Sequence, residues 1–497
     1  MRGPTQRSPD KPIGIIGAGI GGLAAAITLA AAGRSVTVLE RGAVPGGKVA
    51  AIPLGGLAVD AGPGALSLRP VFDALFEAAD TRLDRHLHLT RLPLLGRHLW
   101  PDGSRLDLPA DAAAAESAIG AFAGTAAAKG YRDFMARAAK CWAALEKPFL
   151  TVQRPGALAL GAQAGMRGLL GTSPFGTLWD ALGEHFADPR LRQVFSRLST
   201  YVGTSPLVAP ATLMLVAQVE AGGLWAIEGG MARLPQAMAE AAAAKGVAFR
   251  HGADVAGLRV AGGRIAGVTL RDGEVIEFAQ VILNADPATL AAGHLGAAAA
   301  RAVPAMTPRE RSFSGISWAM AGRAEGLDLP RLTVFHAGDA MAELAALTYR
   351  GRMPDRPSVT LWAQGRHGVA PPPEGREGLL ALVSAPARAD GRRMDPAALA
   401  AAEAAAFGAM QGAGLTITRD ATAVMTPPDY EALAPGTGGA LFGPAVQGWK
   451  AIFSRPAART ALPGLFLAGG ATHPGAGLAM AAISGRLAAE AAMAERI

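Results

Sequence analysis

Cysteine is almost absent from the sequence. Cys141 is the only one among 497 residues, which excludes an intramolecular disulfide and any iron–sulfur or multi-cysteine metal site. The nine histidines are dispersed and show no spacing typical of a metal site. We therefore expect no metal and a buried, inert Cys141. For a chain without disulfides, the default compartment is the cytoplasm.

Clustered basic residues are also lacking. Lys and Arg number 47 against 40 Asp and Glu, a net charge of +7, but they are scattered, and aromatic residues make up only 5% of the chain. Nucleic-acid binding needs basic residues gathered on one face, so we expect no nucleic-acid partner. The positive balance leaves open contact with an anionic membrane surface or a simple contribution to solubility.

One long run carries no charge. Residues 13–33, IGIIGAGIGGLAAAITLAAAG, have the length of a membrane span and a basic segment before them, as in a secretion signal. Five glycines clustered in the first half argue against a continuous helix, because each costs about 1 kcal/mol relative to alanine. The run instead indicates a buried strand over 13–16, a glycine turn over 17–22 and a helix to Ala32. No other segment predicts a spanning helix.

This strand, turn and helix have the pattern of a dinucleotide site. Gly17 permits the turn, Gly19 lets the backbone approach a pyrophosphate, and Gly22 lets helix and strand pack closely. The phosphates would lie at the helix N-terminus. A second strand over 35–40 ends at Glu40, 18 residues after Gly22, where an acid accepts a ribose hydroxyl. The predicted nucleotide-binding residues are Gly17, Ala18, Gly19, Gly22 and Glu40.

Two further loops point to a flavin nucleotide rather than NAD. Gly46-Gly47-Lys48 follows the ribose acid, where it could close over the diphosphate or be a surface turn. Asp60-Ala-Gly62-Pro63-Gly64 follows a third predicted strand in the same way. A minimal NAD site needs only the first glycine loop.

The later segments predict an α/β fold with a nucleotide domain assembled from separated pieces. A helix is expected over 233–244, strands over 247–250 and 255–260, and a strand over 465–468 that enters a glycine-rich loop and a helix from about residue 479. Residues 90–220 look mainly helical, and 310–385 carry strand patterns. We expect a Rossmann-like FAD-binding domain from 11–90, 222–300 and 445–497, and a mixed helix and sheet substrate domain, with membrane-associating helices, from 91–221 and 301–444.

These motifs carry a resemblance to a known family. The glycine loop with PGGKV and VDAGPG resembles flavoproteins of the amine-oxidase and bacterial-type carotenoid (phytoene) desaturase family. VILNADP and AGGATHPGAG are similar to the carotenoid desaturases, and matches to 1-hydroxycarotenoid 3,4-desaturases, also called methoxyneurosporene dehydrogenases, of purple phototrophic bacteria extend over most of the chain. These further matches are STYVGTSPLVAP, LWAIEGGMARL, TPPDYEALAPGTGGALFG, GWKAIFSRP and AMAAISGR.

The resemblance implies an amine-oxidase-like fold, FAD as cofactor and additional contacts to it. Those contacts are Val255, Gly469, Gly470, Gly477, Leu478, Ala479 and Met480, which join Gly46, Gly47, Lys48, Asp60, Gly62 and Pro63. The chain departs from the family pattern at Gly64, where such desaturases usually have Thr, and at Leu478-Ala479, where Val/Ile-Pro is usual.

The implied reaction is FAD-dependent introduction of a C=C bond into an acyclic carotenoid, at the 3,4 position of a 1-hydroxycarotenoid. Hydride passes to flavin N5 and a proton leaves the adjacent carbon. We expect an apolar tunnel lined by the helical region and the 310–385 strands. It would open towards a membrane, with the protein peripheral on the cytoplasmic face and oxygen or a quinone as electron acceptor.

Side chains for catalysis are harder to assign. His473, in the HPGAG loop, could position the flavin or relay a proton, or it could be a loop histidine bonded to backbone. Candidate bases are Glu146, Glu220 and Glu228, which could equally be helix-face or turn residues. Trp225, Trp318, Trp362 and Trp449 could line the tunnel or belong to the core.

Three other functions stay open. One is a phytoene-type desaturase, and another is an oxidase of the amine or protoporphyrinogen type, disfavoured because HPGAG replaces the acid-containing loop of those relatives. The third is a flavin-independent isoprenoid-binding protein with the same fold. The intact Gly17, Gly19, Gly22 and Glu40 argue against it.

Overall fold

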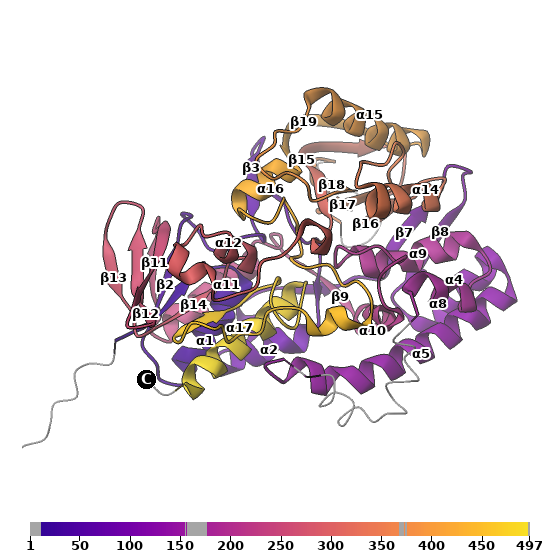
Figure 1. Ribbon diagram of the computed structural model, residues 1–497. Helices are drawn as coiled ribbons and strands as arrows, with labels where there is room; N and C mark the ends of the chain where they lie inside the picture. The colour runs from indigo at the N-terminus through magenta and orange to yellow at the C-terminus, as the bar shows by residue number, and fades with distance from the viewer. Residues whose placement is uncertain (1–10, 155, 157–175, 367–371, 373–374, 496–497) are drawn as a thin grey trace, which may run out of the picture.

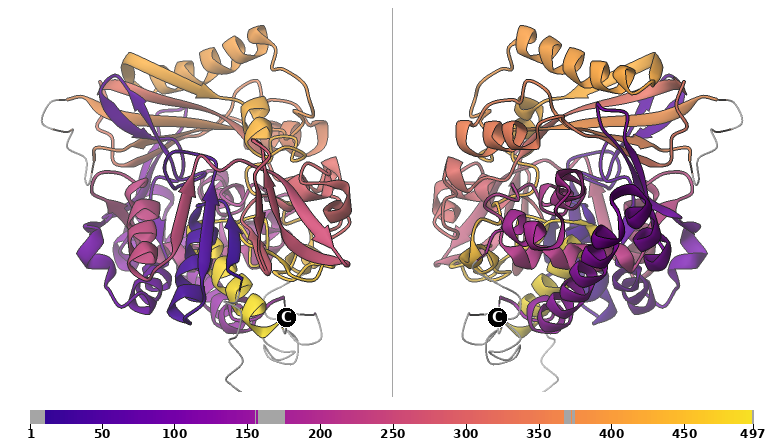
Figure 2. Two further views of the ribbon diagram at one scale, coloured as in Figure 1. Left: turned by 90° about the vertical axis from the view of Figure 1, so that its left-hand side faces the viewer. Right: turned by 90° about the vertical axis from the view of Figure 1, so that its right-hand side faces the viewer.

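The computed structural model describes residues 11–154, 156, 176–366, 372 and 375–495. Two sheets lie in separate layers, with helices packed around the lower one and α15 over the outside of the upper one (Figures 1 and 2). A group of helices from 112–221 lies beside both. The candidate site lies where these three parts meet.

The lower sheet is five-stranded and parallel, in the order β10-β2-β1-β14-β20. Its central strands are short apolar runs buried on both faces, as parallel sheets require, and Ile15 pairs with both Val38 and Ile282. The strands come from separated segments, namely β1 (Ile13–Ile16), β2 (Val36–Glu40), β10 (Ala248–His251), β14 (Gln280–Leu283) and β20 (Leu465–Leu467).

Three helices cover this sheet: α1 (Ile20–Ala31), α11 (Arg233–Ala244) and α17 (Leu478–Ala494). Helices α1 and α17 pack so closely that a Cβ on Gly485 would lie 2.0 Å from the Gly21 carbonyl oxygen. The strands and helices expected here from the sequence are confirmed within a residue or two. One boundary is wrong: the helix begins at Ile20, so Gly21 and Gly22 belong to its first turn. They are glycines because neighbouring atoms crowd them.

The upper sheet is seven-stranded, in the order β19-β15-β18-β17-β16-β7-β8. The long strand β15 pairs antiparallel with β18 and β19, and α15 packs on one face with Ala402, Ala406 and Met410 in the shared core. The bounds are β7 (Leu94–Leu99), β8 (Arg105–Pro109), β15 (Ser314–Glu325), β16 (Leu332–Phe335), β17 (Val359–Ala363), β18 (Glu377–Ala385), β19 (Thr416–Met425) and α15 (Pro396–Gly412).

Strands β7 and β8 are an exception within 90–220, which is mainly helical in its described part, as the sequence predicts. Leu106 and Leu108 of β8 are buried against the helices, while Asp107 pairs with Arg97 of β7 at 2.6 Å. Strand β7 also pairs with β16, more than 230 residues away. That pairing is a long-range contact, which local pattern does not reveal.

The described residues of 112–221 are mainly helical, as expected. Phe134, Phe186 and Phe195 form their centre, and Asp111 and Asp188 cap the helices that follow them. The elements are α4 (Ala112–Ala123), α5 (Thr125–Leu150), α8 (Leu178–His185), α9 (Pro189–Thr200), the 3₁₀ turn η1 (Ala211–Met214) and α10 (Leu215–Ala221).

One sequence expectation is met in this region. Cys141 on α5 is fully buried, and burial raises the pKa of its thiol to about 11. Within the residues that the structure describes, every helix falls short of the length or the apolarity that crossing a membrane would require.

Smaller elements connect these parts. Two hairpin-like units carry β3 (Ala51–Leu54) with β4 (Leu57–Asp60) and β11 (Val255–Ala261) with β12 (Arg264–Leu270) and β13 (Val275–Glu277). Strand β9 (Leu224–Ile227) pairs with β5 (Leu66–Ser67) and β6 (Leu89–Arg91). The remaining elements are α2 (Arg69–Ala78), α3 (Leu83–His86), α12 (Pro287–Ala291), α13 (Ala297–Ala300), η2 (Pro308–Glu310), α14 (Ala340–Ala345), η3 (Ala346–Arg350), α16 (Pro427–Leu433) and η4 (Trp449–Phe453).

Candidate active site

A cavity of about 1460 Å³ lies between the two sheets and the helical group. Small-molecule sites usually measure about 300–1,000 Å³, so this one has room for more than one drug-sized ligand. One part is formed by glycine loops at the carboxyl ends of β1, β2 and β20 and by the first turns of α1 and α17. The other part is formed by apolar side chains.

The first glycine loop converges on Asn284. Its Nδ2 donates to the Gly17 carbonyl oxygen at 3.2 Å. A Cβ on Gly19 would lie 2.9 Å from Nδ2, and one on Gly21 would lie 2.7 Å from Oδ1. The backbone is therefore bare at the start of α1, where no side chain caps the amides after Gly19. The sequence interpretation missed Asn284, although a polar residue ending a buried parallel strand marks a binding edge.

Glu40 stands at the end of β2 in a fixed orientation. Its Oε2 accepts from the Ala18 amide and its Oε1 from the Gly42 amide, both at 2.7 Å. Glu40 also lines the cavity. Because a carboxylate has about four acceptor positions, lone pairs remain for the hydroxyls of a ribose.

The second glycine loop packs against the first. The Gly46 amide donates to the Ala18 carbonyl oxygen at 3.0 Å, and Gly46 and Gly47 have positive φ angles of 147° and 57°. Lys48 follows on the cavity wall, where its Nζ donates to the Leu441 carbonyl oxygen at 2.6 Å. Burial lowers the pKa of Lys48, and the nearby carboxylate of Asp286 partly offsets this.

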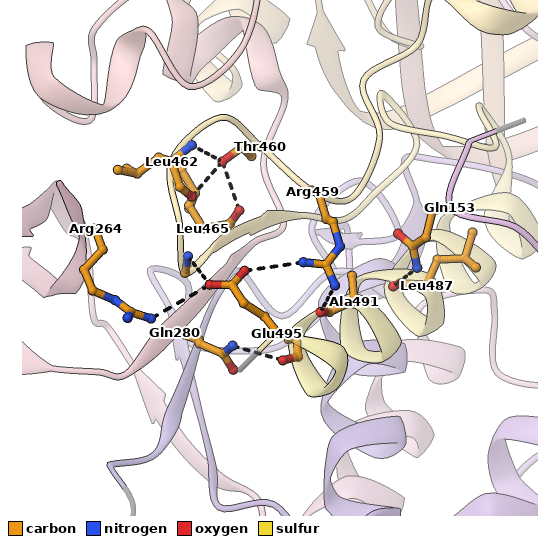
Figure 3. A network of polar contacts seen from close by, with 12 residues as sticks. Gln153, Arg264, Gln280, Arg459, Thr460, Leu462, Leu465, Leu487, Ala491 and Glu495 are labelled. Atoms are coloured by element: carbon orange, nitrogen blue, oxygen red, sulfur yellow. Dashed lines mark hydrogen bonds and ion pairs between the residues drawn. The ribbon is translucent and has the colours of Figure 1, made fainter. Parts of the chain in front are cut away.

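Helix α17 presents a second N-terminus to the same cavity. It begins after Gly477, which has a φ of 116° and offers no side-chain cap. The backbone amides of its first turn are thus available, and the helix dipole favours an anionic or polar group there. The other end of α17 is held by a polar network around Glu495 (Figure 3).

Arg455 holds the loop that leads to α17. It is buried and donates to the carbonyl oxygens of Phe442, Pro444 and Gly470 at 3.1, 2.8 and 2.9 Å. Burial lowers its pKa to about 10. Arg455 lines the cavity and was not found from the sequence, because its partners are loop carbonyls 11 to 15 residues away that no motif marks.

Most of the sequence-predicted cofactor residues meet on this cavity. Those that line it are Gly17, Gly19, Glu40, Gly46, Gly47, Lys48, Gly62, Pro63, Val255, Gly469, Gly470, Gly477, Leu478, Ala479 and Met480. Ala18, Gly22 and Asp60 lie behind it. Gly22 is in contact with the backbone, since a Cβ there would lie 2.1 Å from the Gly17 oxygen.

Asp60 supports the site rather than lining it. Its carboxylate accepts from the amides of Met231 at 2.7 Å and Ala232 at 3.2 Å, just before α11. Burial raises the pKa of this carboxyl. The contact ties the loop after β4 to the first turn of α11.

His473 lies outside the cavity lining. It is buried, with Nε2 2.9 Å from the Phe149 carbonyl oxygen and the ring edge-on to Phe149 at 4.7 Å between centroids. Burial lowers its pKa to about 4, so the ring is neutral near pH 7. This is the backbone-bonded arrangement that the sequence offered as the alternative to a catalytic role.

Some of the candidate acids and tryptophans line the cavity and others lie outside it. Glu146 and Glu220 line the cavity, while Glu228 is exposed elsewhere. Trp362 lines it and occupies the space beside Gly64, where a Cβ would lie 2.2 Å from the indole. Trp318 belongs to the upper core, Trp225 packs on the lower core, and Trp449 is 39% exposed.

The remaining walls are mainly apolar. They come from α5, from the α9–α10 region and from β15 to β18, and include Leu145, Phe149, Leu213, Val216, Leu332, Val334, Leu344, Leu380 and Leu382. Such a lining favours an extended hydrocarbon and excludes water from the space next to the glycine loops.

The residues present fit FAD. Gly19 and Gly21, where a Cβ would collide with Asn284, leave the backbone bare. Two helix N-termini without side-chain caps line the same cavity, and so does Glu40 at the end of a strand. These are the requirements of a dinucleotide's diphosphate and ribose. Across the described residues, His, Cys, Asp and Glu form no group of three or more that could hold a metal.

Comparison with known proteins gives consistent matches. Residues 20–312 match the family described as flavin containing amine oxidoreductase. The chain is 42% identical to the hydroxyneurosporene desaturase of Rubrivivax gelatinosus over 97% of its length and 93% of the relative. It is also 42% identical to the hydroxyneurosporene desaturase of Cereibacter sphaeroides over 97% of each. An oxidoreductase structure from Methanosarcina mazei aligns with a TM-score of 0.58 and 14% identity, covering 97% of this chain and 100% of that one. This last match shows the fold alone.

Proposed function

Because the chain belongs to the flavin-containing amine oxidoreductases, and within them to the carotenoid desaturases it matches over 97% of its length, we propose that it desaturates an acyclic carotenoid. It is an FAD-dependent oxidoreductase. The specific reaction proposed is 3,4-desaturation of a 1-hydroxycarotenoid. The observation that carries the proposal is the continuous cavity, which joins a dinucleotide cradle to apolar walls.

The glycine loops and helix N-termini would hold the cofactor. Gly17, Gly19 and the first turn of α1 would take the diphosphate, Glu40 a ribose, and the first turn of α17 the polar ring edge. When bound, FAD supplies a hydride acceptor at flavin N5. The residues we propose as cofactor contacts are the predicted ones that line the cavity, together with Asn284.

The apolar walls would place the substrate and keep water away. Trp362, Leu380 and Leu382 line the cavity from the upper sheet, and Leu213 and Val216 line it from the helical group. A hydrocarbon held between them lies next to the cofactor loops without competing hydration. Specificity in such a pocket comes from the few polar groups within it.

The domain division, membrane contact and location follow as proposals. The five strands of the lower sheet all come from 11–90, 222–300 and 445–497, which supports assigning these segments to an FAD domain. Val44 and Leu433 are 63% and 49% exposed and also line the cavity. Such residues at a mouth suit entry from a lipid surface, so we propose peripheral binding on the cytoplasmic membrane face, with oxygen or a quinone as electron acceptor.

The test is carotenoid analysis in two hosts, one making 1-hydroxyneurosporene and one making phytoene, each with this chain or an empty vector. We expect loss of two hydrogens at C3–C4 of the hydroxylated substrate only, read by mass and absorption spectrum. Conversion of phytoene instead would assign a phytoene-type desaturase. A purified protein that stays colourless with added FAD would leave an isoprenoid-binding protein.

A further inference from the structure

An ion pair is buried in the wall of the cavity. Arg197 of α9 and Glu220 of α10 lie 2.7 Å apart, with side chains only 5% and 7% exposed. Both residues line the cavity, as do the apolar neighbours Val216 and Val219. The pair therefore faces a cavity whose walls are mainly apolar but also carry polar side chains such as Gln193, Glu343 and Ser358.

Stability alone does not account for this pair. Removing two charges from water costs about as much as their attraction returns, so a buried pair is usually no more stabilising than apolar residues of the same volume. The buried pair Arg366–Glu377 offers a contrast. It joins parts of the upper sheet, with Arg366 also donating to the Leu329 carbonyl oxygen, and it does not line the cavity.

The pair has hydrogen-bonding capacity to spare. Arg197 uses Nη2 for Glu220 and Nη1 for the Val194 carbonyl oxygen. Its Nε and the buried hydroxyl of Tyr201 make no hydrogen bond of standard geometry with the described residues, although the two side chains lie near enough to interact with each other. The Tyr201 ring lies beside the guanidinium, 5.6 Å from Cζ to the ring centroid, and also lines the cavity. The cluster thus offers a donor, an acceptor and a hydroxyl that can be either.

Backbone hydrogen bonds link the segment after the cluster to the cofactor cradle. Two residues after Tyr201, the Gly203 carbonyl oxygen accepts from the Phe313 amide at 2.8 Å, and the Phe313 oxygen accepts from Leu441 at 3.2 Å. The Leu441 oxygen in turn accepts from Lys48. A short chain of bonds therefore connects the cluster to the second glycine loop.

A second connection runs through β9. Glu220 is followed by Leu224 and Trp225, which pair with Ser67 and Leu66 of β5, directly after the predicted flavin loop that ends at Gly64. In a 1-hydroxycarotenoid the hydroxyl oxygen is separated from C3 by two carbons, C1 and C2. A group that binds this hydroxyl must therefore lie near the reacting carbons, and the cluster lines the same cavity as the cofactor loops.

We propose that Arg197, Glu220 and Tyr201 form the binding site for the terminal hydroxyl of the carotenoid. The hydroxyl accepts from Arg197 or Tyr201 and donates to Glu220. It thereby sets which carbon pair lies next to the flavin and selects hydroxylated substrates. This inference rests on the proposed function and names the residues that give it specificity.

The first test uses the FAD-loaded wild type and three substrates: 1-hydroxyneurosporene, its 1-methoxy ether and neurosporene. A ligand without the hydroxyl leaves buried polar groups unpaired, so we expect kcat/KM to fall about 10- to 100-fold for neurosporene. The ether oxygen accepts a hydrogen bond but cannot donate one, so kcat/KM for the methoxy substrate should lie between the other two values. Equal kcat/KM for all three would overturn the inference while leaving the proposed function intact, and no turnover of any carotenoid would refute both.

The second test uses variants. Tyr201→Phe and Glu220→Gln should each lower the ratio of kcat/KM for 1-hydroxyneurosporene to kcat/KM for neurosporene at least about 5-fold. The change should come from a lower kcat/KM for the hydroxylated substrate, with the value for neurosporene unchanged. The double variant Arg197→Met/Glu220→Leu should remove the preference. Tyr131→Phe is the matched control, because it deletes a buried tyrosine hydroxyl near Arg197 that does not line the cavity. An unchanged preference in flavin-loaded Tyr201→Phe and Glu220→Gln would overturn the assignment, and if they do not fold the wild-type comparison decides.

Discussion

The missing side chain at Gly64 leaves room for the indole of Trp362. A Cβ at this position would lie 2.2 Å from two ring atoms, and the Gly64 carbonyl oxygen accepts from Arg331 Nε at 2.9 Å, which fixes the backbone. The related desaturases resembled by the sequence usually have threonine here. The pair Gly64 and Trp362 is therefore an alternative way of filling one part of the cavity wall.

Gly64→Thr should lower flavin content and stability, because the threonine side chain and the indole would occupy the same space. Overpacking of this kind costs about 1–3 kcal/mol. Combining it with Trp362→Leu should restore most of both. Flavin absorbance per protein and the free energy of unfolding measure the effects. If the single variant binds flavin as well as the wild type, the indole is free to move and the packing argument fails.

At the scale of the element, α17 connects the far side of the lower sheet to the cavity. Its last turns are tied down by Arg459, which donates to the Ala491 carbonyl oxygen at 2.9 Å, and by Gln280, which donates to Ala492 at 3.0 Å. Glu495 accepts from the Gly464 amide at 2.9 Å and pairs with Arg459 and Arg264 (Figure 3). The network sets the position of the helix whose first turn borders the cavity.

Glu495→Ala should therefore weaken flavin binding from a distance. Losing a charge-assisted hydrogen bond to a backbone amide costs about 1–2 kcal/mol of stability, and a looser α17 should raise the Kd for FAD several-fold. Glu490→Ala is the matched control. It removes an i,i+4 pair with Arg486 on the same helix, for which we expect about 0.5 kcal/mol or less. Equal effects of the two variants on the Kd for FAD would contradict this role.

What the sequence could predict depends on how local the signal is. The strand–glycine–helix units at β1–α1 and β20–α17, and the helix α11, were predicted because their periodicity and glycines lie within a few dozen residues. Strands β7 and β8 were missed since their partner β16 is far along the chain. A short strand next to a helical region has no distinctive pattern of its own.

The same distinction applies to the site. Glycine loops carry a motif, so most predicted cofactor residues do line the cavity. Asn284 and the Arg197–Glu220 pair depend on contacts between residues more than 20 positions apart. Arg455 depends on contacts with loops 11 to 15 positions away that follow no helix or strand periodicity. Asp60 and His473 are residue types that often act in catalysis or binding, but in this fold both are buried and form hydrogen bonds to backbone groups. Residue type indicates what a side chain can do, whereas the tertiary fold decides what it faces.

For the whole molecule, buried neutral histidines make stability depend on pH. His98 and His336 are stacked and joined by a 2.9 Å hydrogen bond between Nδ1 and Nε2. Burial lowers the pKa of His336 to about 3 and that of His473 to about 4, and it also lowers that of His98. In the unfolded chain a histidine has a pKa of about 6.5. Between these values the unfolded state binds more protons, so stability falls as pH drops below 6.5.

Buried acids act in the opposite direction. Burial raises the pKa of Asp60, Asp286, Glu220 and Glu343, so the folded state holds these protons at a pH where the unfolded chain releases them. Their contribution to stability grows as pH falls. The pH dependence of folding stability therefore contains contributions of opposite sign. The contribution of a single histidine has to be measured as the difference between the wild type and a variant that lacks it.

His473→Gln isolates one histidine, because glutamine can still donate to the Phe149 carbonyl oxygen but does not titrate. A group with a pKa of about 4 when folded and about 6.5 when unfolded loses about 2 kcal/mol of stability between pH 7.5 and pH 5. The variant lacks this loss, so the gap between wild type and variant should move by about that amount in favour of the variant. Urea unfolding of the FAD-loaded proteins at both pH values measures the gap. A stability difference that stays constant between the two pH values would mean that His473 has the same pKa in the folded and unfolded states. If the wild type has a bell-shaped pH profile of activity that the variant lacks, His473 would instead have a catalytic role.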